Sequence, residues 1–412
     1  MNDHYQRTTC RICNGKAFEN VIRMPKTPIG DLYIKEDRLF DQQSTYPLSV
    51  YFCNDCGLIQ LLDVINPEII YKDYIYETKA SLGLDHHFSK YAESVVNDLG
   101  LAPDSLVIDI GCNDATLLKA FRSQGMKVVG VEPVELIAEK NNQDGIKTFS
   151  EFFSSALIKK IKVEYGAADL ITANNVMANI DDLSDFLSNV KDLLSPSGVF
   201  VFESGYGAEL VSNCVLDNIH HEHYSYFTLT PILYLFEKNG LEVIDVKYVD
   251  TKGGSIRVFG QYKGGMRQIN ESVSERKHYE ERLKFNRAET YQDYSIKMSQ
   301  LKDELHNKLS KYKQEGLKIG AYGASVGVTT LLYYFGLEDY ISVLFDDNEV
   351  RHGLYSPGLH IPVMSSEHIY NENIDIIVIL AWRYADPIIK RHAKFSELGG
   401  KFLIPLPAIE MV

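Results

Sequence analysis

The chain has 412 residues, 45% of them hydrophobic and 24% charged, which exceeds one ordinary core and predicts two or three domains. The formal net charge of −14 repels phosphate backbones and argues against a nucleic acid partner. No apolar run is long enough to span a bilayer, and the polar first residues lack the apolar stretch of a signal peptide, so a cytoplasmic location without a membrane partner is expected.

Two Cys-x-x-Cys pairs open the sequence: Cys10 with Cys13, and Cys53 with Cys56. In a reducing compartment such thiols favour metal binding over disulfides. Four thiolates in two pairs are typical of a closed, tetrahedral, structural zinc site. The stretch between the pairs is longer than the usual spacing of about 15–20 residues, so it is expected to form a looped excursion. Residues 1–70 are therefore predicted to be a small zinc-binding module, with four buried free thiols as the alternative.

From residue 71 to 265, apolar strands alternate with helices, after a helical pattern that begins at Ser81. The predicted strands span residues 106–110, 128–131, 169–173, 199–203, 241–249 and 255–262, and the predicted helices span 116–124, 136–141, 183–194 and 230–239. Continuous apolar strands that alternate with helices are typical of a parallel sheet covered on both faces. The last two strands are expected to close this sheet.

The rest of the chain predicts a linker and a second α/β unit. Residues 266–315 contain no Gly or Pro, are densely charged and place apolar residues at helical spacing, which predicts a helical linker. Residues 316–412 alternate again, with predicted strands at 318–322, 341–346, 374–380 and 402–405. The expected fold class is α/β, with a zinc-binding module, a central Rossmann-like domain and a C-terminal Rossmann-like domain.

The first strand of the central domain ends in the turn Asp109-Ile-Gly-Cys-Asn-Asp114, and the next strand ends at Glu132. Ligands of open α/β sheets bind at the carboxyl ends of strands. Gly111 lets the backbone approach a ligand without a Cβ clash, and Asp109 can balance an ammonium or sulfonium group. Glu132 follows at the distance where an acid can accept both ribose hydroxyls. With Asn113 and Asp114 in the turn, the pattern predicts an S-adenosylmethionine pocket.

Two other interpretations of this turn stay open. A dinucleotide site expects Gly-x-Gly-x-x-Gly, whereas this turn contains a single glycine. An α/β unit without a cofactor would leave Asn113, Asp114 and Glu132 as polar groups at strand ends without a use. S-adenosylmethionine is therefore the favoured ligand.

Three histidines and a carboxylate stand together at His220, His221, Glu222 and His223. A metal cluster is one interpretation, but the spacing does not match His-Glu-x-x-His and no second ligand cluster is evident. A polar loop with satisfied imidazoles is another. The third is general base catalysis, since histidine titrates near neutrality and a neighbouring carboxylate can orient it.

Taken together, these features resemble the zinc-containing, S-adenosylmethionine-dependent sugar C-methyltransferases, which methylate carbon-3 of nucleotide-linked 4-keto-6-deoxyhexoses. The resemblance runs from Cys10 to Pro407. It is carried by the two cysteine pairs, Tyr76, residues 109–114, Gly130-Val-Glu-Pro133, Glu222-His223, Gly253-Gly254, Tyr322-Gly-Ala-Ser325 and Ala381-Trp382. It implies a class I methyltransferase domain, S-adenosylmethionine and structural Zn²⁺ as cofactors, and a nucleotide sugar as substrate. A monomer or a weak homo-oligomer is expected.

The resemblance also implies roles for single residues. His223 would be the base that takes the carbon-3 proton, and Glu222 would bind or orient the sugar and that imidazole. Tyr76 would lie over the zone of methyl transfer. The donor would be contacted by Asn175, Glu132 and Pro133.

The C-terminal unit would hold the nucleotide diphosphate. The turn Tyr322-Gly323-Ala324-Ser325 would form a phosphate cradle at a helix N-terminus. The other substrate-binding candidates are Lys252, Arg257, Arg351, Trp382 and Arg383. Such a local positive pocket is required because the protein as a whole is acidic.

Two candidate catalytic positions depart from the family pattern. Asn179 stands where the family usually has a histidine, and His220 where it usually has a tyrosine. An amide cannot do acid–base work at neutral pH but can donate a hydrogen bond, whereas His220 can replace a phenol as donor or act as a second base. These departures leave O- or N-methylation of a nucleotide sugar or other small polar acceptor open. A non-catalytic protein that binds a nucleotide sugar or the donor is the alternative from another class.

Overall fold

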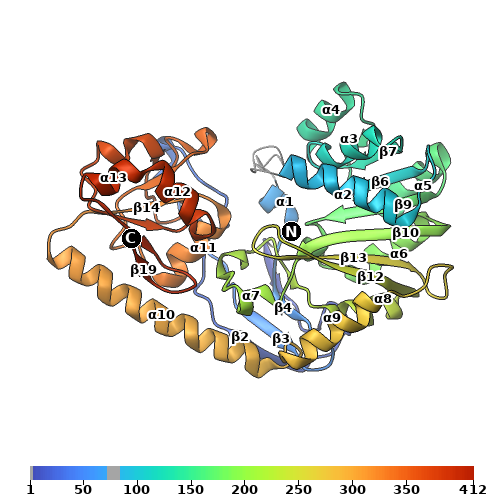
Figure 1. Cartoon of the computed structure of the whole chain (residues 1–412), viewed down its shortest axis with the longest axis horizontal. Helices are drawn as coiled ribbons and strands as arrows, with labels where there is room; N and C mark the ends of the chain where they lie inside the picture. The colour runs from blue at the N-terminus through green and yellow to red at the C-terminus, as the bar shows by residue number, and fades with distance from the viewer. Residues whose placement is uncertain (1–2, 72–83) are drawn as a thin grey trace.

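The computed structural model of the chain describes residues 3–71 and 84–412. Figure 1 shows two lobes, one formed by residues 84–262 and the other by residues 316–412, with the long helix α10 (Ala288–Gln314) running beneath the second lobe to the base between them. Strands from the first part of the chain lie at the base between the lobes. The N-terminal module is therefore placed to contact both lobes.

Short antiparallel strands build the N-terminal module. They are β1 (His4–Gln6), β2 (Phe18–Ile22), β3 (Val50–Cys53), β4 (Ile59–Leu61) and β5 (Asp63–Ile65), followed by α1 (Pro67–Tyr71). Strand β1 pairs with β5, and the other three form one sheet with β11 (Ser225–Tyr226). The zinc-binding module therefore shares a sheet with the strand that comes shortly after the histidine segment.

Among the described residues, the central region folds around a seven-stranded sheet in the order β12-β13-β10-β9-β6-β7-β8. Its strands are β6 (Leu106–Ile110), β7 (Lys127–Val131), β8 (Thr148–Phe149), β9 (Ala168–Asn174), β10 (Leu194–Gly205), β12 (Leu241–Val249) and β13 (Ser255–Tyr262). Strands β6 to β10 run parallel, whereas β13 pairs antiparallel with β10 and β12. The two predicted closing strands are confirmed, and they make the sheet mixed.

Helices surround this sheet and follow the expected alternation. They are α2 (Leu84–Leu99), α3 (Thr116–Ser123), α4 (Glu135–Gln143), α5 (Ser155–Tyr165), α6 (Leu183–Leu193), α7 (Glu209–Ser212) and α8 (Leu229–Lys238). Helix α5 was not predicted, although its sequence carries a start signal. Ser154 caps it by accepting the Leu157 amide at 3.4 Å, and Leu157, Ile158 and Ile161 bury one face.

The C-terminal lobe is a second α/β unit, as predicted. Its strands are β14 (Ile319–Tyr322), β15 (Leu344–Asp346), β16 (Val363–Ser365), β17 (Ile376–Ile379), β18 (Lys401–Ile404) and β19 (Glu410–Met411), and its helices are α11 (Val326–Phe335), α12 (Ala385–Arg391) and α13 (Ala393–Glu397). The sheet order is β16-β15-β14-β17-β18-β19, with only β19 antiparallel to its neighbour in this described part of the chain. The order reverses at β14, so a ligand is expected beyond the carboxyl ends of β14 and β17.

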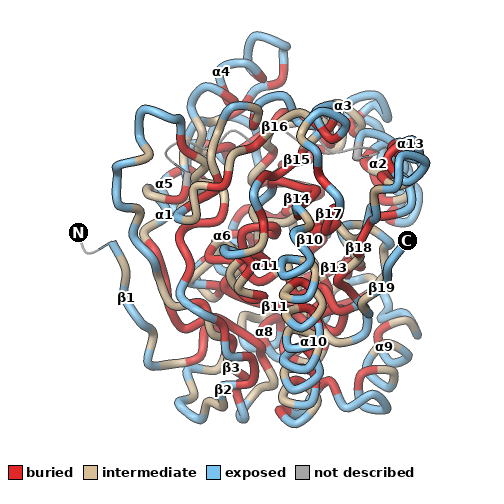
Figure 2. The backbone as a smooth tube through the Cα atoms, turned by 90° about the vertical axis from the view of Figure 1, so that its left-hand side faces the viewer, coloured by how far each residue is buried: buried red, intermediate tan, exposed pale blue. Residues whose placement is uncertain are grey.

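The predicted helical linker forms α9 (Glu271–Arg282) and α10. Helix α10 buries one stripe, which includes Tyr291 and Leu305. Near its start the ring of Tyr291 lies 6.0 Å from that of Phe52 in the N-terminal module, and further along α10 packs on α11. One buried hydrophobic cluster contains residues of the module and of both lobes, and Figure 2 shows buried backbone running through all three. The parts are therefore packed together rather than tethered.

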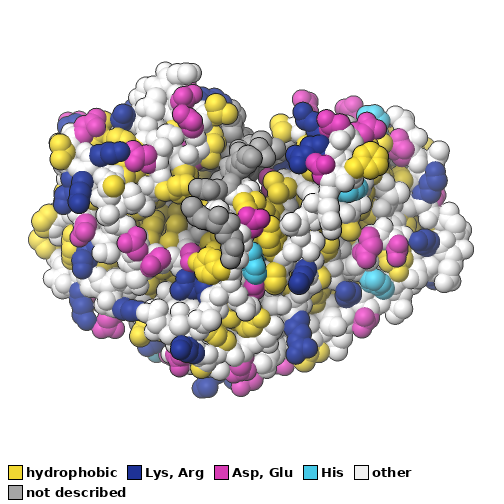
Figure 3. All heavy atoms as spheres, turned by 180° about the vertical axis from the view of Figure 1, so that it is seen from behind, with side chains coloured by type: hydrophobic (Ala, Val, Ile, Leu, Met, Phe, Trp, Pro, Cys, Tyr) yellow, Lys and Arg dark blue, Asp and Glu magenta, His cyan; other side chains and the backbone are white. Residues whose placement is uncertain are grey.

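Two features of the described surface concern membrane-spanning helices and patches of like charge. Within the described ranges, no helix combines the length and hydrophobicity needed to cross a membrane. On the face shown in Figure 3, acidic and basic side chains are interspersed. That face therefore carries no broad basic patch of the kind that binds nucleic acid.

Candidate active site

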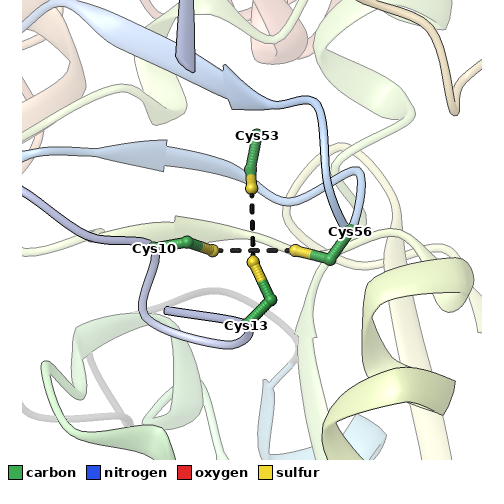
Figure 4. Close-up of side chains that lie close together, drawn as sticks. All are labelled: Cys10, Cys13, Cys53 and Cys56. Atoms are coloured by element: carbon green, nitrogen blue, oxygen red, sulfur yellow. Dashed lines mark hydrogen bonds between the residues drawn. The ribbon is translucent and has the colours of Figure 1, made fainter. Parts of the chain in front are cut away.

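The four predicted metal ligands converge on one point (Figure 4). Their sulfur atoms all lie within 4.8 Å of one another, with 3.6 Å between Cys10 and Cys56 and 3.5 Å between Cys13 and Cys53. Zn–S bonds of about 2.3 Å in a tetrahedron separate the sulfur atoms by about 3.8 Å, which is close to these distances. Four thiolates leave no position for a substrate, so the set fits a structural zinc ion.

Arg11, between the first two ligands, connects the zinc site to the histidine loop. Its buried guanidinium pairs with Asp181 (Nε to Oδ1, 3.1 Å) and lies 5.0 Å from the ring of Tyr224. Burial lowers the pKa of Arg11 to about 10. The hydroxyl of Tyr224 donates to the carbonyl of Ile65 at 3.0 Å. Because Tyr224 directly follows His223, the zinc knuckle supports the segment that carries the predicted base.

The turn after β6 has the backbone expected of a ligand-binding turn. Gly111 (φ 68°), Asn113 (φ 47°) and Ala115 (φ 58°) are all left-handed. A Cβ at position 111 would lie 2.5 Å from Cγ2 of Val176, so glycine is required there on both grounds. Left-handed asparagine and alanine store strain, which is typical of functional turns.

Glu132, at the end of β7, holds this turn in place. Its two carboxylate oxygens accept hydrogen bonds from the amides of Asn113 (2.9 Å) and Val134 (3.0 Å). Burial raises the pKa of Glu132, while both amides lower it. An ionised carboxylate has about four acceptor positions, so two stay available for ribose hydroxyls. Pro133 follows directly and is half-buried.

The two aspartates of the turn bond to their own chain. Asp109 is buried and accepts the Thr172 hydroxyl at 2.6 Å, and burial raises its pKa to about 7. Asp114 accepts the amide (3.2 Å) and the hydroxyl (2.6 Å) of Thr116, where α3 begins. Both residues therefore shape the turn, and a direct contact with the donor stays a prediction.

Two asparagines end β9 beside this turn. Asn175, the predicted donor contact, is left-handed (φ 56°), and its amide donates to the Glu203 carbonyl at 2.7 Å. Sequence reasoning missed Asn174, whose side-chain oxygen and nitrogen are buried without a hydrogen-bond partner in the described ranges. A consecutive pair of asparagines at a strand end is the signal that could have found it. Asn174, which lies near the Tyr91 hydroxyl, can thus offer a ligand both a donor and an acceptor.

The geometry of the histidine loop assigns the protons of His223. Its Nδ1 lies 3.0 Å from the carbonyl of Asn218. A carbonyl only accepts, so Nδ1 carries the proton and Nε2 carries the lone pair. Burial lowers the pKa of His223 to about 4, which keeps the ring neutral at pH 7. The partner that orients this ring among the described residues is thus a backbone carbonyl, where Glu222 was expected.

The two neighbouring histidines differ from each other. The ring of His220 is 3.9 Å from that of His223, and its Nδ1 is buried without a partner among the residues described. Burial and the charge of His223 lower the pKa of His220. His221 points elsewhere, with Nε2 3.4 Å from the carbonyl of Tyr46, and burial lowers its pKa to about 4. The structure therefore brings His220, but not His221, together with His223.

Glu222 lies among charges from three parts of the chain. Burial and the nearby carboxylate of Asp31 raise its pKa to about 7, and Lys252 lowers it. Asp31 belongs to the excursion of the N-terminal module and pairs with Arg351 of the C-terminal lobe at 2.5 Å. Lys252 is exposed and left-handed (φ 52°) in the turn between β12 and β13. Glu222 and Lys252 are thus close enough to interact at the junction of the module and both lobes.

The predicted phosphate cradle follows β14 at the start of α11. The Ala324 amide donates to Asp346 at 2.6 Å, and the Ser325 hydroxyl caps α11 by accepting the Val328 amide at 3.4 Å. Gly323 is left-handed (φ 117°). The hydroxyl of Tyr322 lies 3.4 Å from a ring nitrogen of His392 at the end of α12. The cradle is therefore formed, with its serine hydroxyl already used as a cap.

The predicted substrate-binding cations divide into two groups. Arg257 is buried in the central lobe, where it pairs with Glu203 (2.7 and 2.9 Å) and stacks on the Tyr91 ring at 3.8 Å. Arg351 and Arg383 stand at the junction of the lobes. Arg257 is thus a support of the central sheet, and the junction residues are better placed for a ligand.

Asp217 connects the histidine segment to the C-terminal lobe. Its carboxylate accepts Arg383 at 2.7 Å and the Trp382 ring nitrogen at 3.4 Å. A Cβ at Gly253 would approach Cδ of Arg383 to 3.2 Å, so the turn with Lys252 lies against this pair. The turn that carries Lys252 therefore lies beside Arg383, and the role of Lys252, Trp382 and Arg383 in substrate binding stays a prediction.

Two predicted catalytic residues need separate mention. Tyr76 lies outside the described residues. Asn179 ends the 3-10 turn η3 (Met177–Asn179) after β9, is half-buried, and donates its backbone amide to the Val176 carbonyl at 2.8 Å. This turn contacts β11, which follows the histidine loop, so Asn179 lies on the side of the predicted site.

Sequence reasoning also missed a buried network around Glu203 at the end of β10. Besides Arg257, this carboxylate accepts His87 of α2 (2.9 Å) and the hydroxyl of Thr251 (3.2 Å). His87 and Arg257 keep the pKa of Glu203 low despite its burial. These contacts hold α2 and the β12–β13 turn beside the turn that follows β6. Because the residues are far apart in the sequence, no local sequence pattern could have predicted their contact.

Comparison with known proteins agrees with this arrangement. Three family models match successive parts of the chain: "Putative zinc binding domain" over residues 10–71, "Methyltransferase domain" over 84–246, and "C-methyltransferase C-terminal domain" over 250–407. The C-methyltransferase NovU of Streptomyces niveus is 30% identical over 399 residues, which cover 97% of this chain and 95% of that protein.

Solved structures resemble parts of the chain. An S-adenosylmethionine-dependent methyltransferase from Clostridium acetobutylicum ATCC 824 is 15% identical, with a TM-score of 0.35, and the match covers 48% of this chain and 96% of that one. Magnesium protoporphyrin IX methyltransferase from Synechocystis PCC 6803 is 16% identical, with a TM-score of 0.34, and the match covers 47% and 88%.

The chain therefore belongs to the C-methyltransferase family. It is an S-adenosylmethionine-dependent enzyme with a zinc-binding domain, in which Cys10, Cys13, Cys53 and Cys56 are arranged to hold the ion. The predicted fold class and both cofactors are confirmed. The dinucleotide interpretation of the donor turn and the non-catalytic alternative are set aside, and carbon is favoured over oxygen or nitrogen as the methyl acceptor.

Proposed function

We propose that this enzyme transfers a methyl group to carbon-3 of a nucleotide-linked 4-keto-6-deoxyhexose, with His223 as the general base. The observation that carries the proposal is the bond from His223 Nδ1 to the Asn218 carbonyl at 3.0 Å. It fixes the tautomer with the lone pair on Nε2, which is the form a base needs. The family resemblance suggests the acceptor class, and the orientation of His223 supports its role as the base.

The acid–base requirements of this reaction are modest. A ketone next to carbon-3 acidifies its proton, so a neutral imidazole is a sufficient base. Burial of His223 keeps it neutral, with a pKa of about 4. The developing enolate needs hydrogen-bond donors, and Lys252 and a Glu222 carboxyl with a pKa of about 7 are the nearby groups that can donate. His220 is placed to be a further donor beside the base.

Donor and acceptor come from different lobes in this proposal. S-adenosylmethionine, when bound, supplies an electrophilic methyl group. Glu132 would accept its ribose hydroxyls, and Asn174 would bind its amino acid part, with Pro133 and Asn175 as further contacts. Holding both reactants at the junction of the lobes contributes much of the rate, since an oriented pair reacts far faster than a free one.

The acceptor's nucleotide diphosphate would lie on the C-terminal lobe. The amides at the start of α11 face the carboxyl ends of β14 and β17, where open α/β sheets bind ligands. Arg351, Arg383 and Trp382 stand at the same junction, and Arg351 keeps one buried guanidinium nitrogen without a partner among the described residues. These groups would provide the local positive charge that an acidic protein needs to bind a dianion.

The test uses the zinc-loaded protein with S-adenosylmethionine and a panel of dTDP-, GDP- and CDP-linked 4-keto-6-deoxyhexoses. We expect at least one sugar to gain a methyl group by mass spectrometry. A substrate deuterated at carbon-3 must lose the label in the methylated product, because the base removes that atom. Methylated product that keeps the carbon-3 deuterium would overturn the assignment and indicate a heteroatom acceptor.

A further inference from the structure

A cavity separate from the predicted active site lies between α7, the end of β12 and α9, whose positions can be followed in Figure 1. Its volume is about 650 Å³, within the range of about 300–1,000 Å³ that small-molecule sites occupy. None of the predicted zinc, donor or acceptor residues lines it. It adjoins the turn that carries Lys252, because a Cβ at Gly254 would lie 2.6 Å from Cγ of the lining residue Glu209.

Arg276 of α9 is held in this cavity by aromatic rings. Its guanidinium carbon lies 5.4 Å from the ring centre of Tyr206, 5.5 Å from that of Tyr248 and 5.1 Å from that of Tyr279. Tyr206 is itself fixed, since its hydroxyl donates to the buried Glu280 at 2.8 Å. Rings on several elements thus hold the guanidinium in place without neutralising its charge.

Two carboxylates, Glu209 and Glu275, line this site with the arginines, and burial raises the pKa of Glu209 while the charge of Arg276 lowers it. Within the described ranges, neither Arg276 nor Arg282, which also lines the cavity, has a carboxylate oxygen within 4.0 Å. Arg257, Arg351 and Arg383 each have such a partner. The two guanidinium groups therefore keep N–H donors that no carboxylate engages at close range in the described part of the chain.

We propose that this cavity is a second ligand site, which binds a phosphate or diphosphate ester of a hydroxylated small molecule. The guanidinium of Arg276 presents a fork of N–H donors that matches phosphate oxygens, and Arg282 at the rim adds a second positive charge. The Glu209 carboxylate on the wall can accept a hydroxyl of the same ligand. Carboxylate ligands are disfavoured, because they offer fewer oxygens to two arginines.

The site is tested by isothermal titration of the zinc-loaded protein with inorganic pyrophosphate at low ionic strength, where charge–charge contacts are least screened. We expect the double variant Arg276→Gln with Arg282→Gln to weaken this binding at least about tenfold, since charged hydrogen bonds are lost. Lys277→Gln removes the same charge from the exposed face of α9 and should leave the binding unchanged. Glu209→Gln should tighten it, because a negative charge on the wall is removed.

Pyrophosphate can also bind the proposed nucleotide site, so Arg383→Gln is titrated in parallel. Binding that is lost in Arg383→Gln and kept in the double variant would place the anion on the C-terminal lobe and overturn the proposal. Wild-type protein that takes up no pyrophosphate would overturn it as well. Thermal unfolding of each variant and its affinity for S-adenosylhomocysteine separate a lost anion site from a damaged fold. Methyl transfer to a keto sugar is assayed independently, so the two proposals can fail separately.

Discussion

The two α/β units of this enzyme hold their ligand turns with the same device. In the central unit, Glu132 directly follows the second strand and accepts the amide of Asn113 in the turn after the first strand. In the C-terminal unit, Asp346 ends β15 and accepts the amide of Ala324 in the turn after β14. Each acid also accepts the amide two residues further along the chain. An acid that fixes a turn while keeping free acceptor positions suits a ribose in either unit.

The two turns differ in backbone conformation, and only the central one has non-glycine residues in the left-handed region. The central turn has left-handed Asn113 and Ala115 and starts α3 without a side-chain cap. The C-terminal turn starts α11 with a regular cap from Ser325. Two residues before the turn glycine, the central unit buries Asp109 where the C-terminal unit has Ala321. The same topology therefore supports a strained, charged turn for the donor and a relaxed, neutral turn in the other unit.

Loss of zinc tests whether the N-terminal module stabilises both α/β units. Of the changes considered, it should lower the stability of the protein most. Structural zinc contributes on the order of 10 kcal/mol to folding, which is as much as a whole domain's stability. We expect Cys10→Ser with Cys53→Ser to lose the metal and the cooperative thermal transition of both lobes. Zinc content and calorimetry check this. Cys214→Ser, a buried cysteine outside the cluster, should keep the metal, and a metal-free variant with normal melting would contradict the prediction.

Replacement of His223 tests whether the chemistry belongs to the loop between the units rather than to either turn. Asparagine keeps a donor for the Asn218 carbonyl but removes Nε2, so it deletes the base and spares the packing. We expect kcat to fall by about 10²–10⁴-fold, the usual contribution of a general base, while affinity for S-adenosylhomocysteine is unchanged. His221→Asn is the matched control in the same loop, and near-normal turnover of His223→Asn would disprove the assigned base.

The buried carboxyl of Asp109, absent from the C-terminal unit, should give the central unit a pH dependence of its own. Burial raises its pKa from the usual 3.8 to about 7. Between these values the folded chain holds a proton that the unfolded chain has released, so the free energy of unfolding falls as the pH rises. In the wild-type protein this group should lower the free energy of unfolding by on the order of 3 kcal/mol between pH 4 and 7, and we expect Asp109→Asn to abolish that decrease.

Denaturant unfolding of the donor-free protein across that pH range measures the effect. Asp104→Asn, at an exposed position before β6, is the control that should keep the wild-type slope. A wild-type slope that persists in Asp109→Asn would assign it to other buried groups.

Much of the fold could be predicted because its signals are local. The predicted strand 106–110 has the same bounds as β6. The cysteine pairs, Glu132 and the Gly111 turn could each be recognised from patterns only a few residues long. Contacts between distant segments could not be predicted. Arg11 lies on Tyr224, and His87 bonds Glu203, across more than a hundred residues in each case. Such pairs depend on how whole elements dock, which spacing along the chain does not encode.

The orientation of His223, the proposed base, shows the same limit. The sequence places a carboxylate beside His223, and adjacency predicted that Glu222 would orient the ring. In the structure the Asn218 carbonyl does so, because the loop folds back on itself and brings a backbone group to Nδ1. The residue type was enough to propose His223 as the base. Its hydrogen-bond partner depends on the backbone conformation of the loop, which the sequence pattern does not give.

The sharpest test of the comparison exchanges equivalent changes between the two units. The carboxylates of Glu132 and Asp346 each accept one backbone amide on each of their two oxygens. Glu132→Gln and Asp346→Asn replace one of those oxygens with an NH₂ group, which cannot accept. The two variants should therefore damage their turns to the same degree, and each serves as the control for the other. We expect Glu132→Gln to weaken S-adenosylhomocysteine binding about tenfold and to leave the nucleotide sugar's affinity unchanged, with the reverse for Asp346→Asn. Titration of each variant with each ligand gives four affinities.

If both variants weaken the binding of the same ligand, the acids act through the shared junction and not as separate ribose sites. If only Glu132→Gln has an effect, the likeness of the C-terminal turn is architectural, and the acceptor's nucleotide is held by Arg351, Arg383 and Trp382 alone.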